Sequence, residues 1–153
     1  MTAYIWHTHH GMWKVVPPFE DSFDVLKAYI TDPSGYVYWS TPRFQNEIKP
    51  GDIAFILRTV DKSGNSGIVA CGRVEESPRQ LTPVSLSEFA LPARLTPPGW
   101  DEIVAPSSWK TGIRIEREFW DDPIAKGLHA AGGAIGRLSD DAHRAIESEI
   151  AGR

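Results

Sequence analysis

An uninterrupted apolar run, Ile53 to Leu57, constrains the fold of this chain more than any other feature of its sequence. The run follows a Pro-Gly turn and lacks the polar alternation of a half-exposed strand, which is typical of a strand covered on both faces. After a loop rich in turn formers, residues 68–76 (IVACGRVEE) predict an antiparallel return strand. Gly72 interrupts this second strand, which indicates a bulge or a close approach between backbones.

The remaining segments predict further strands around this pair and helices outside them. Strand patterns occur at residues 3–7, 36–40 and 109–119, and helical patterns at 20–30, 139–150 and, more weakly, 85–91. Ser139 is the expected N-cap of the last helix, with acidic residues in the first turn. The chain shows no regular βαβ alternation and no internal repeat. It therefore predicts a small α+β fold, a mostly antiparallel β-barrel of five to six strands with two or three peripheral helices.

Length and charge narrow the class of protein. The 153 residues suit a single domain, residues 1–153, of ordinary globular composition. The net charge of −4 argues against a broad basic surface, so any nucleic-acid role must depend on a local site. The apolar runs are much shorter than a membrane helix, and the N-terminus lacks a signal-peptide pattern. With Cys71 expected as a buried thiol in a reducing compartment, we expect a cytoplasmic protein with no membrane partner.

His7, His9 and His10 are the first candidates for chemistry, because alternate positions of a strand can present ligands to a metal ion on one side. No further Cys, His or HExxH group stands in a matching context, so the sequence predicts no metal site. Catalytic patterns are also missing. There is no GxSxG nucleophile elbow, and the GGAIG segment at 132–136 lacks the ending of a phosphate loop. We therefore predict no cofactor and no catalytic residue.

Tryptophan is more informative, since Trp6, Trp39 and Trp109 each stand at the beginning or end of a predicted strand. Strand ends of a small barrel meet at its mouth, where indole rings could wall a slot for a planar ligand. A nucleobase stacked on an indole gains about 1–3 kcal/mol, and a buried methyl group adds about 0.8 kcal/mol. The polar side chains available at the floor of such a slot are Ser40, Thr41 and His7. The alternative interpretation is that the three indoles fill the core.

The order of these segments resembles the EVE domain, a PUA-like fold similar to the YTH domain. The resemblance lies in five stretches between Ala3 and Ile124 and in the closing helix at 138–150. The five stretches are YIWH at 4–7, YVYWSTPRF at 36–44, IKPGDIAFIL at 48–57, GIVACGRVEES at 67–77 and WKTGIRIEREFWDDPI at 109–124. The segment HTHHGMW and residues 77–106 depart from the family pattern.

This resemblance implies a PUA-like β-barrel that binds DNA or RNA carrying a modified base, which is flipped into an aromatic cage. Trp39 matches the cage tryptophan, and Ser40 would contact the base edge or backbone. The second wall would come from Trp109, with Trp100 as the second choice. His7 would supply polar contacts to the base, and Arg43 and Lys110 would meet phosphate groups. A reader of this kind binds weakly alone, so a partner protein could supply avidity and effector activity.

Two alternatives remain open at the level of sequence. One is a hydrolase on the related ASCH-type scaffold, acting on RNA or a small amide, which needs a lysine and a carboxylate in one pocket. The residues available for it are Lys14, Lys49 and Lys110, with Glu47 or Glu75. The other alternative is a protein-interaction module whose tryptophans form an apolar patch.

Overall fold

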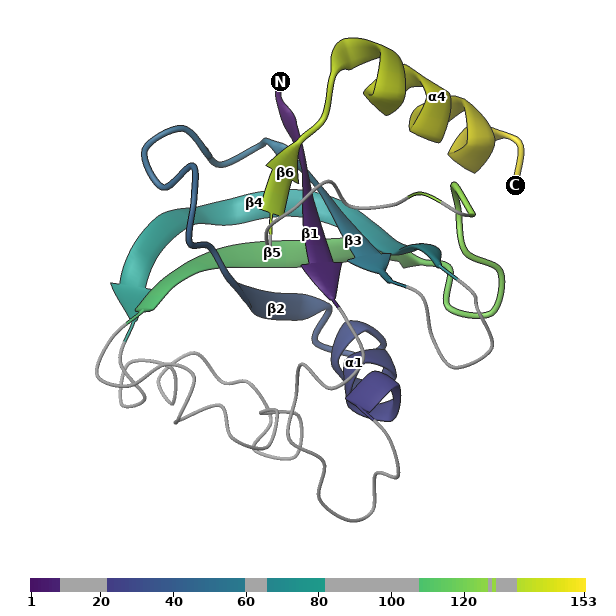
Figure 1. The fold of residues 1–153 in the computed structure, drawn as a ribbon. Helices are drawn as coiled ribbons and strands as arrows, with labels where there is room; N and C mark the ends of the chain where they lie inside the picture. Colours follow the sequence, from purple (N-terminus) through teal and green to yellow (C-terminus); the bar gives the residue numbers. More distant parts are fainter. Residues whose placement is uncertain (9–21, 60–65, 82–107, 127, 129–134) are drawn as a thin grey trace.

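The computed structural model of the protein describes residues 1–8, 22–59, 66–81, 108–126, 128 and 135–153. Within this part of the chain, six strands form one sheet, and a helix lies on each side of it (Figure 1). The strands are β1 Ala3–Thr8, β2 Tyr36–Ser40, β3 Ile53–Arg58, β4 Gly67–Leu81, β5 Ser108–Glu118 and β6 Ile135–Arg137, and the helices are α1 Ser22–Ile30 and α4 Asp140–Ala151.

The sheet has the order β2-β5-β4-β3-β1-β6, and only the β1–β3 pair is parallel. The expected mostly antiparallel α+β architecture is therefore confirmed. The expected closure into a barrel is not, because the outer strands β2 and β6 do not pair with each other in the described residues. The sheet curves but stays open (Figure 1). The short strand β6 was not predicted, since three residues after a glycine-rich segment carry too little pattern.

Strand β3 is buried on both faces, as its apolar run predicts. Ala54 and Ile56 belong to a core cluster shared with α1, which we call the α1-side core. Phe55 and Leu57 belong to a second cluster shared with Ile146 of α4, which we call the α4-side core. The alternation of side chains along one strand thus divides the apolar interior into two layers.

Gly72 lies where the pairing between β4 and β5 shifts register. A Cβ atom at this position would lie 1.9 Å from the carbonyl oxygen of Arg114 on β5, far inside van der Waals contact. The predicted close approach is confirmed, and its reason is that only glycine allows the two backbones to come this near.

Asp52, the residue before β3, ties the start of this strand to β1. Its carboxylate accepts the backbone N–H groups of Thr2 at 3.2 Å and Lys49 at 2.9 Å. The first bond fixes the N-terminal strand beside β3, and the second closes the Lys-Pro-Gly-Asp turn. The Gly-Asp pair thus has a structural role in positioning two central strands.

Both helices begin or end as their sequences indicate. The hydroxyl of Ser139 accepts the N–H of Ala142 at 3.2 Å, which confirms Ser139 as the N-cap of α4. After α1, Asp32 Oδ2 accepts the N–H of Ser34 at 3.1 Å, and Gly35 adopts a positive φ of 62°. This turn reverses the chain into β2.

Tyr29 of α1 binds the open edge of β2. Its hydroxyl accepts the backbone N–H of Tyr38 at 3.0 Å and donates to the carbonyl oxygen of the same residue at 3.2 Å. Unpaired N–H and C=O groups on an edge strand are a template for pairing with another chain. One phenol therefore satisfies both outward backbone groups of Tyr38.

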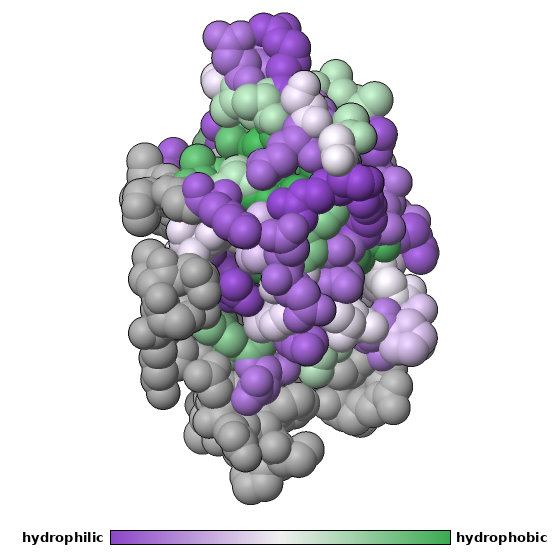
Figure 2. All heavy atoms as spheres, turned by 90° about the vertical axis from the view of Figure 1, so that its right-hand side faces the viewer, coloured by the Kyte–Doolittle hydropathy of each residue, from purple (hydrophilic) through white to green (hydrophobic). Residues whose placement is uncertain are grey.

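The described surface is mainly hydrophilic on the side shown in Figure 2, with hydrophobic residues visible in the gaps between hydrophilic ones. Neither described helix has the length and apolar character that crossing a membrane requires.

Candidate nucleic-acid interface

The antiparallel pairing of β2 with β5 brings most of the predicted site residues together. Trp39 lies opposite Thr111, and Ser40 lies opposite Lys110. One residue further on, the N–H of Thr41 donates to the carbonyl oxygen of Trp109 at 2.9 Å. Residues 39–41 and 109–111 therefore form one continuous end of the sheet.

Four of these residues form a group that we call the Trp–Thr square: Trp39 and Thr41 from the β2 side, and Trp109 and Thr111 from β5. The hydroxyl oxygens of Thr41 and Thr111 lie 2.5 Å apart and are buried. Because Thr41 also donates to the carbonyl oxygen of Trp39 at 3.0 Å, the proton between the two hydroxyls comes from Thr111. Strand alternation places both indoles on the face that carries Ile113, which is the α1-side face.

Trp39 is buried, with 3 % of its surface exposed. Its ring packs in the α1-side core, 5.9 Å from the ring of Tyr29 between centroids. The structure thus corrects the expectation of an open rim position, because α1 covers the end of the strand. Trp109 is only half-buried, so it is the more accessible indole of the square. The proposed contact of Trp39 with a base stays a prediction.

Trp6 and His7 lie on β1, which β4 and β3 separate from β5 in the sheet order. Trp6 is fully buried in the α1-side core, and its indole N–H has no acceptor in the described part of the chain. His7 is also buried, and strand alternation puts it on the opposite, α4-side face. The structure therefore groups Trp6 with the core that contains Trp39, but it separates His7 from the square. Trp100 lies outside the described residues.

Lys110 differs most from its sequence interpretation as a surface lysine that meets phosphate. It is 1 % exposed, and burial lowers the pKa of its ammonium group to about 8. A lysine held in this way does not offer a hydrated charge to a phosphate, so the expected surface position is wrong. Arg43, in contrast, is exposed, with its guanidinium 5.0 Å from the ring centroid of Phe44.

A polar cluster that the sequence analysis missed lies beside Lys110 on the same face of β5. The hydroxyls of Tyr36 and Tyr38 both donate to Glu76 Oε2 at 2.5 Å, and Arg79 donates to Oε1 at 3.2 Å. Burial opposes ionisation of Glu76, but these three hydrogen bonds lower its pKa below the usual value. Burial and the bonds to Glu76 raise the pKa of both phenols. The sequence signal for this cluster was the pair of alternating tyrosines in YVYW, which a strand places on one face.

The residues named for the hydrolase alternative are not grouped by the described structure. Glu75 forms an ion pair with Arg114 at 2.5 Å, and Glu47 takes part in the turn that follows Phe44 through its backbone N–H. Lys14 lies outside the described residues, as do His9 and His10 of the histidine cluster. Within the described residues, no three side chains of His, Cys, Asp or Glu gather as metal ligands. The prediction of no metal at His7, His9 and His10 stays a prediction.

No protein-family model matches this sequence, and no curated protein matches it. Among solved structures, the chain is similar to human THYN1, whose crystal structure was determined in complex with DNA containing 5-methylcytosine. The TM-score is 0.58 and the identity 10 %, over 97 % of this chain and 96 % of that chain. A likeness at this identity establishes the fold, and it confirms the predicted PUA-like α+β class.

Proposed function

We propose that this protein binds nucleic acid and recognises a methylated base, as its resemblance to EVE domains implies. The observation that carries the proposal is the Trp–Thr square, two indoles and two hydroxyls at one end of a PUA-like sheet. The similar fold of THYN1, a protein crystallised with DNA containing 5-methylcytosine, supports DNA as the polymer. Proteins act through sites rather than folds, so the proposed recognition depends on the geometry of the square.

The strand register makes the two indoles neighbours on one face of the sheet, where they could flank one base. Trp39 lies opposite Thr111, and Trp109 lies two residues before Thr111 on β5, so the indoles are diagonal neighbours on one face. Diagonal neighbours in an antiparallel pair are about 7–8 Å apart. A base held between two rings needs about 7 Å, which is twice the roughly 3.4 Å rise between stacked bases of DNA.

Thr41 and Thr111 occupy the other diagonal of the square, and in the proposed complex their hydroxyls would face the edge of a bound base. Because both are buried, a hydrogen bond to the base would form away from water, where polar contacts discriminate most strongly. A methyl group buried beside them gains about 0.8 kcal/mol. Access requires the side chains over Trp39 to move, since its ring is covered without ligand, so Trp109 is the first indole that a base meets.

Phosphate contacts contribute little to this proposed interface. Arg43 is exposed two residues beyond Thr41, where it can reach the nucleic-acid backbone. Lys110 is buried on the other face of β5 and does not contribute in this state. With a net charge of −4, affinity would come from the base pocket, and a partner protein would add avidity and effector activity.

The direct test replaces Trp109 with alanine and measures binding to a labelled DNA duplex with one 5-methylcytosine by fluorescence anisotropy. Loss of a stacking face worth about 1–3 kcal/mol weakens binding about five- to 150-fold. Trp120→Ala is the matched control, because this indole is half-buried at the other end of β5, beside the Arg58 guanidinium at 4.6 Å. Equal effects of the two substitutions would place the site elsewhere, and a wild-type protein that binds no oligonucleotide, DNA or RNA, would end the proposal.

A further inference from the structure

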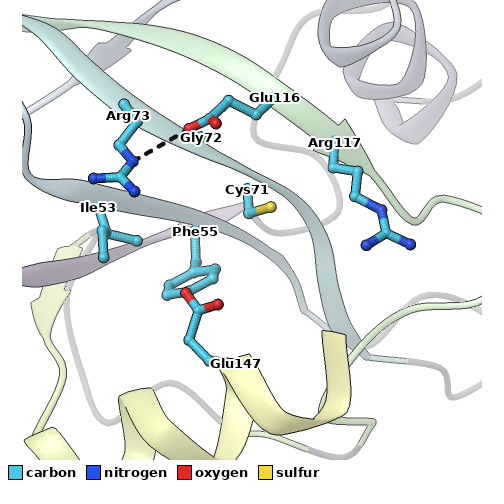
Figure 3. Close-up of a pocket in the computed structure, with 8 residues that line it drawn as sticks. All are labelled: Ile53, Phe55, Cys71, Gly72, Arg73, Glu116, Arg117 and Glu147. Atoms are coloured by element: carbon cyan, nitrogen blue, oxygen red, sulfur yellow. Dashed lines mark ion pairs between the residues drawn. The ribbon is translucent and has the colours of Figure 1, made fainter. Parts of the chain in front are cut away.

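A cavity of about 300 Å³ lies on the face of the sheet opposite the Trp–Thr square. It opens between the central strands and α4, and side chains from β3, β4, β5 and α4 line it (Figure 3). This volume is at the lower end of the range of about 300–1,000 Å³ that is usual for small-molecule sites.

The floor of the cavity is apolar. Ile53 and Phe55 of β3 supply an aliphatic and an aromatic surface, and Cys71 of β4 adds its thiol, which points into the cavity (Figure 3). Gly72 contributes no side chain, and its close contact with the backbone of β5 leaves no room for a larger residue at this position.

The rim carries four charges that are not equivalent. Arg73 and Glu116 neutralise each other in an ion pair of 3.4 Å. Arg117 is drawn outward, with its guanidinium 5.1 Å from the ring centroid of Phe119. Glu147 remains beside the floor, held by a bond of 3.2 Å between its Oε1 and His143 Nε2.

His143 also fixes the position of this carboxylate relative to the floor. Its ring packs edge-on against Phe55, with 6.0 Å between centroids. Glu147 Oε2 has no hydrogen-bond partner in the part of the chain that the structure describes. A carboxylate oxygen beside an aromatic face is a suitable acceptor for an ammonium group, which can also contact the ring.

The charges around the Cys71 thiol favour a positively charged ligand in the cavity. The pKa of Cys71 is raised to about 11, first by burial, then by Glu147 and Glu116, while Arg117 acts in the opposite direction. The negative charges of the rim therefore outweigh Arg117 at this point of the cavity. The same shift keeps the thiol protonated and unreactive at neutral pH.

We propose that this cavity is a binding site for a small organic amine, with its ammonium group on Glu147 and its apolar body against Phe55 and Ile53. The site is separate from the proposed nucleic-acid interface, because it lies on the other face of the sheet and uses none of the same side chains. It does not depend on the proposed function.

The test compares three probes of one shape: phenethylamine, phenethyl alcohol as its neutral analogue, and phenylacetate as an anionic analogue. Chemical shift perturbation in two-dimensional NMR spectra of the full chain gives both the location and the affinity of each probe. We expect the amine to bind best, with shifts at Ile53 and Cys71. Glu147→Gln should weaken amine binding about two- to fivefold, as for a half-exposed ion pair, and leave the alcohol unchanged, because only the amine uses the charge.

Asp141→Asn is the matched control, since it removes one carboxylate from the same helix at a side chain that is 92 % exposed and outside the cavity. This variant should bind the amine as the wild type does. The proposal is overturned if the amine binds no better than the alcohol, if the control weakens binding as much as Glu147→Gln, or if the shifts map outside the cavity. A thermal melt of each variant confirms that it is folded before the comparison.

Discussion

Replacing Tyr29 with phenylalanine tests how the open edge of the sheet is stabilised. The substitution keeps the ring in the α1-side core and removes one hydroxyl, which holds the N–H and the C=O of Tyr38 at 3.0 and 3.2 Å. Both residues are buried, so water does not replace the lost partner. One buried group left unsatisfied costs about 1–3 kcal/mol, and we expect a loss of about 2–6 kcal/mol for the two groups.

A chain of this length loses about 2–4 °C in Tm per kcal/mol, so the expected decrease is roughly 4–24 °C in a calorimetric melt. Hydrogen exchange of the Tyr38 amide should accelerate at the same time. Tyr4→Phe is the matched control, because Tyr4 is a second buried tyrosine of the α1-side core and lies on β1, away from the edge strand β2. If the two variants have the same Tm, the hydrogen bonds of Tyr29 do not stabilise the edge strand, and the reasoning is refuted.

Three further substitutions test other parts of the structure. Gly72→Ala forces β4 from β5 and should lower the free energy of unfolding by about 3 kcal/mol or more, measured by urea denaturation; an unchanged midpoint would contradict the backbone contact. From pH 7 to pH 10 the wild type should gain up to about 3 kcal/mol of stability relative to Lys110→Met, because above pH 8 the unfolded wild-type chain binds a proton that the folded chain has lost. An unchanged difference between the two proteins would mean that the pKa of Lys110 is ordinary. Trp39→Ala should cost about 3–5 kcal/mol of stability and Trp109→Ala clearly less, as judged by thermal melts; equal losses would contradict the difference in burial.

The features that could be predicted from the sequence are those with a local physical cause. The run from Ile53 to Leu57 predicts burial on both faces because no polar side chain alternates with it. Gly72 predicts a close approach because no other residue permits one, and Ser139 predicts a helix start because its hydroxyl can accept a helical N–H. Each of these signals lies within a few residues of its effect.

The features that escaped prediction depend on contacts between distant segments. Trp39 does end a strand, as its sequence position indicates, but the ring of Tyr29 covers it, and no pattern around Trp39 shows where α1 docks. Lys110 alternates with apolar residues as an exposed lysine would, yet its side chain is buried. Thr111 became part of the candidate site only through its cross-strand partner Thr41, a pairing that depends on the register between β2 and β5.

The central claim, that the protein recognises a methylated base, is tested most directly by one comparison of the wild-type protein. Its affinity is measured for a DNA duplex with a single 5-methylcytosine and for the same duplex with cytosine, at several salt concentrations. A buried methyl group worth about 0.8 kcal/mol predicts about a fourfold preference for the methylated duplex. The net charge of −4 and the exposed Arg43 predict a weak salt dependence, with two to four phosphate contacts at about 0.9 each. Equal affinity for the two duplexes at every salt concentration would contradict the account.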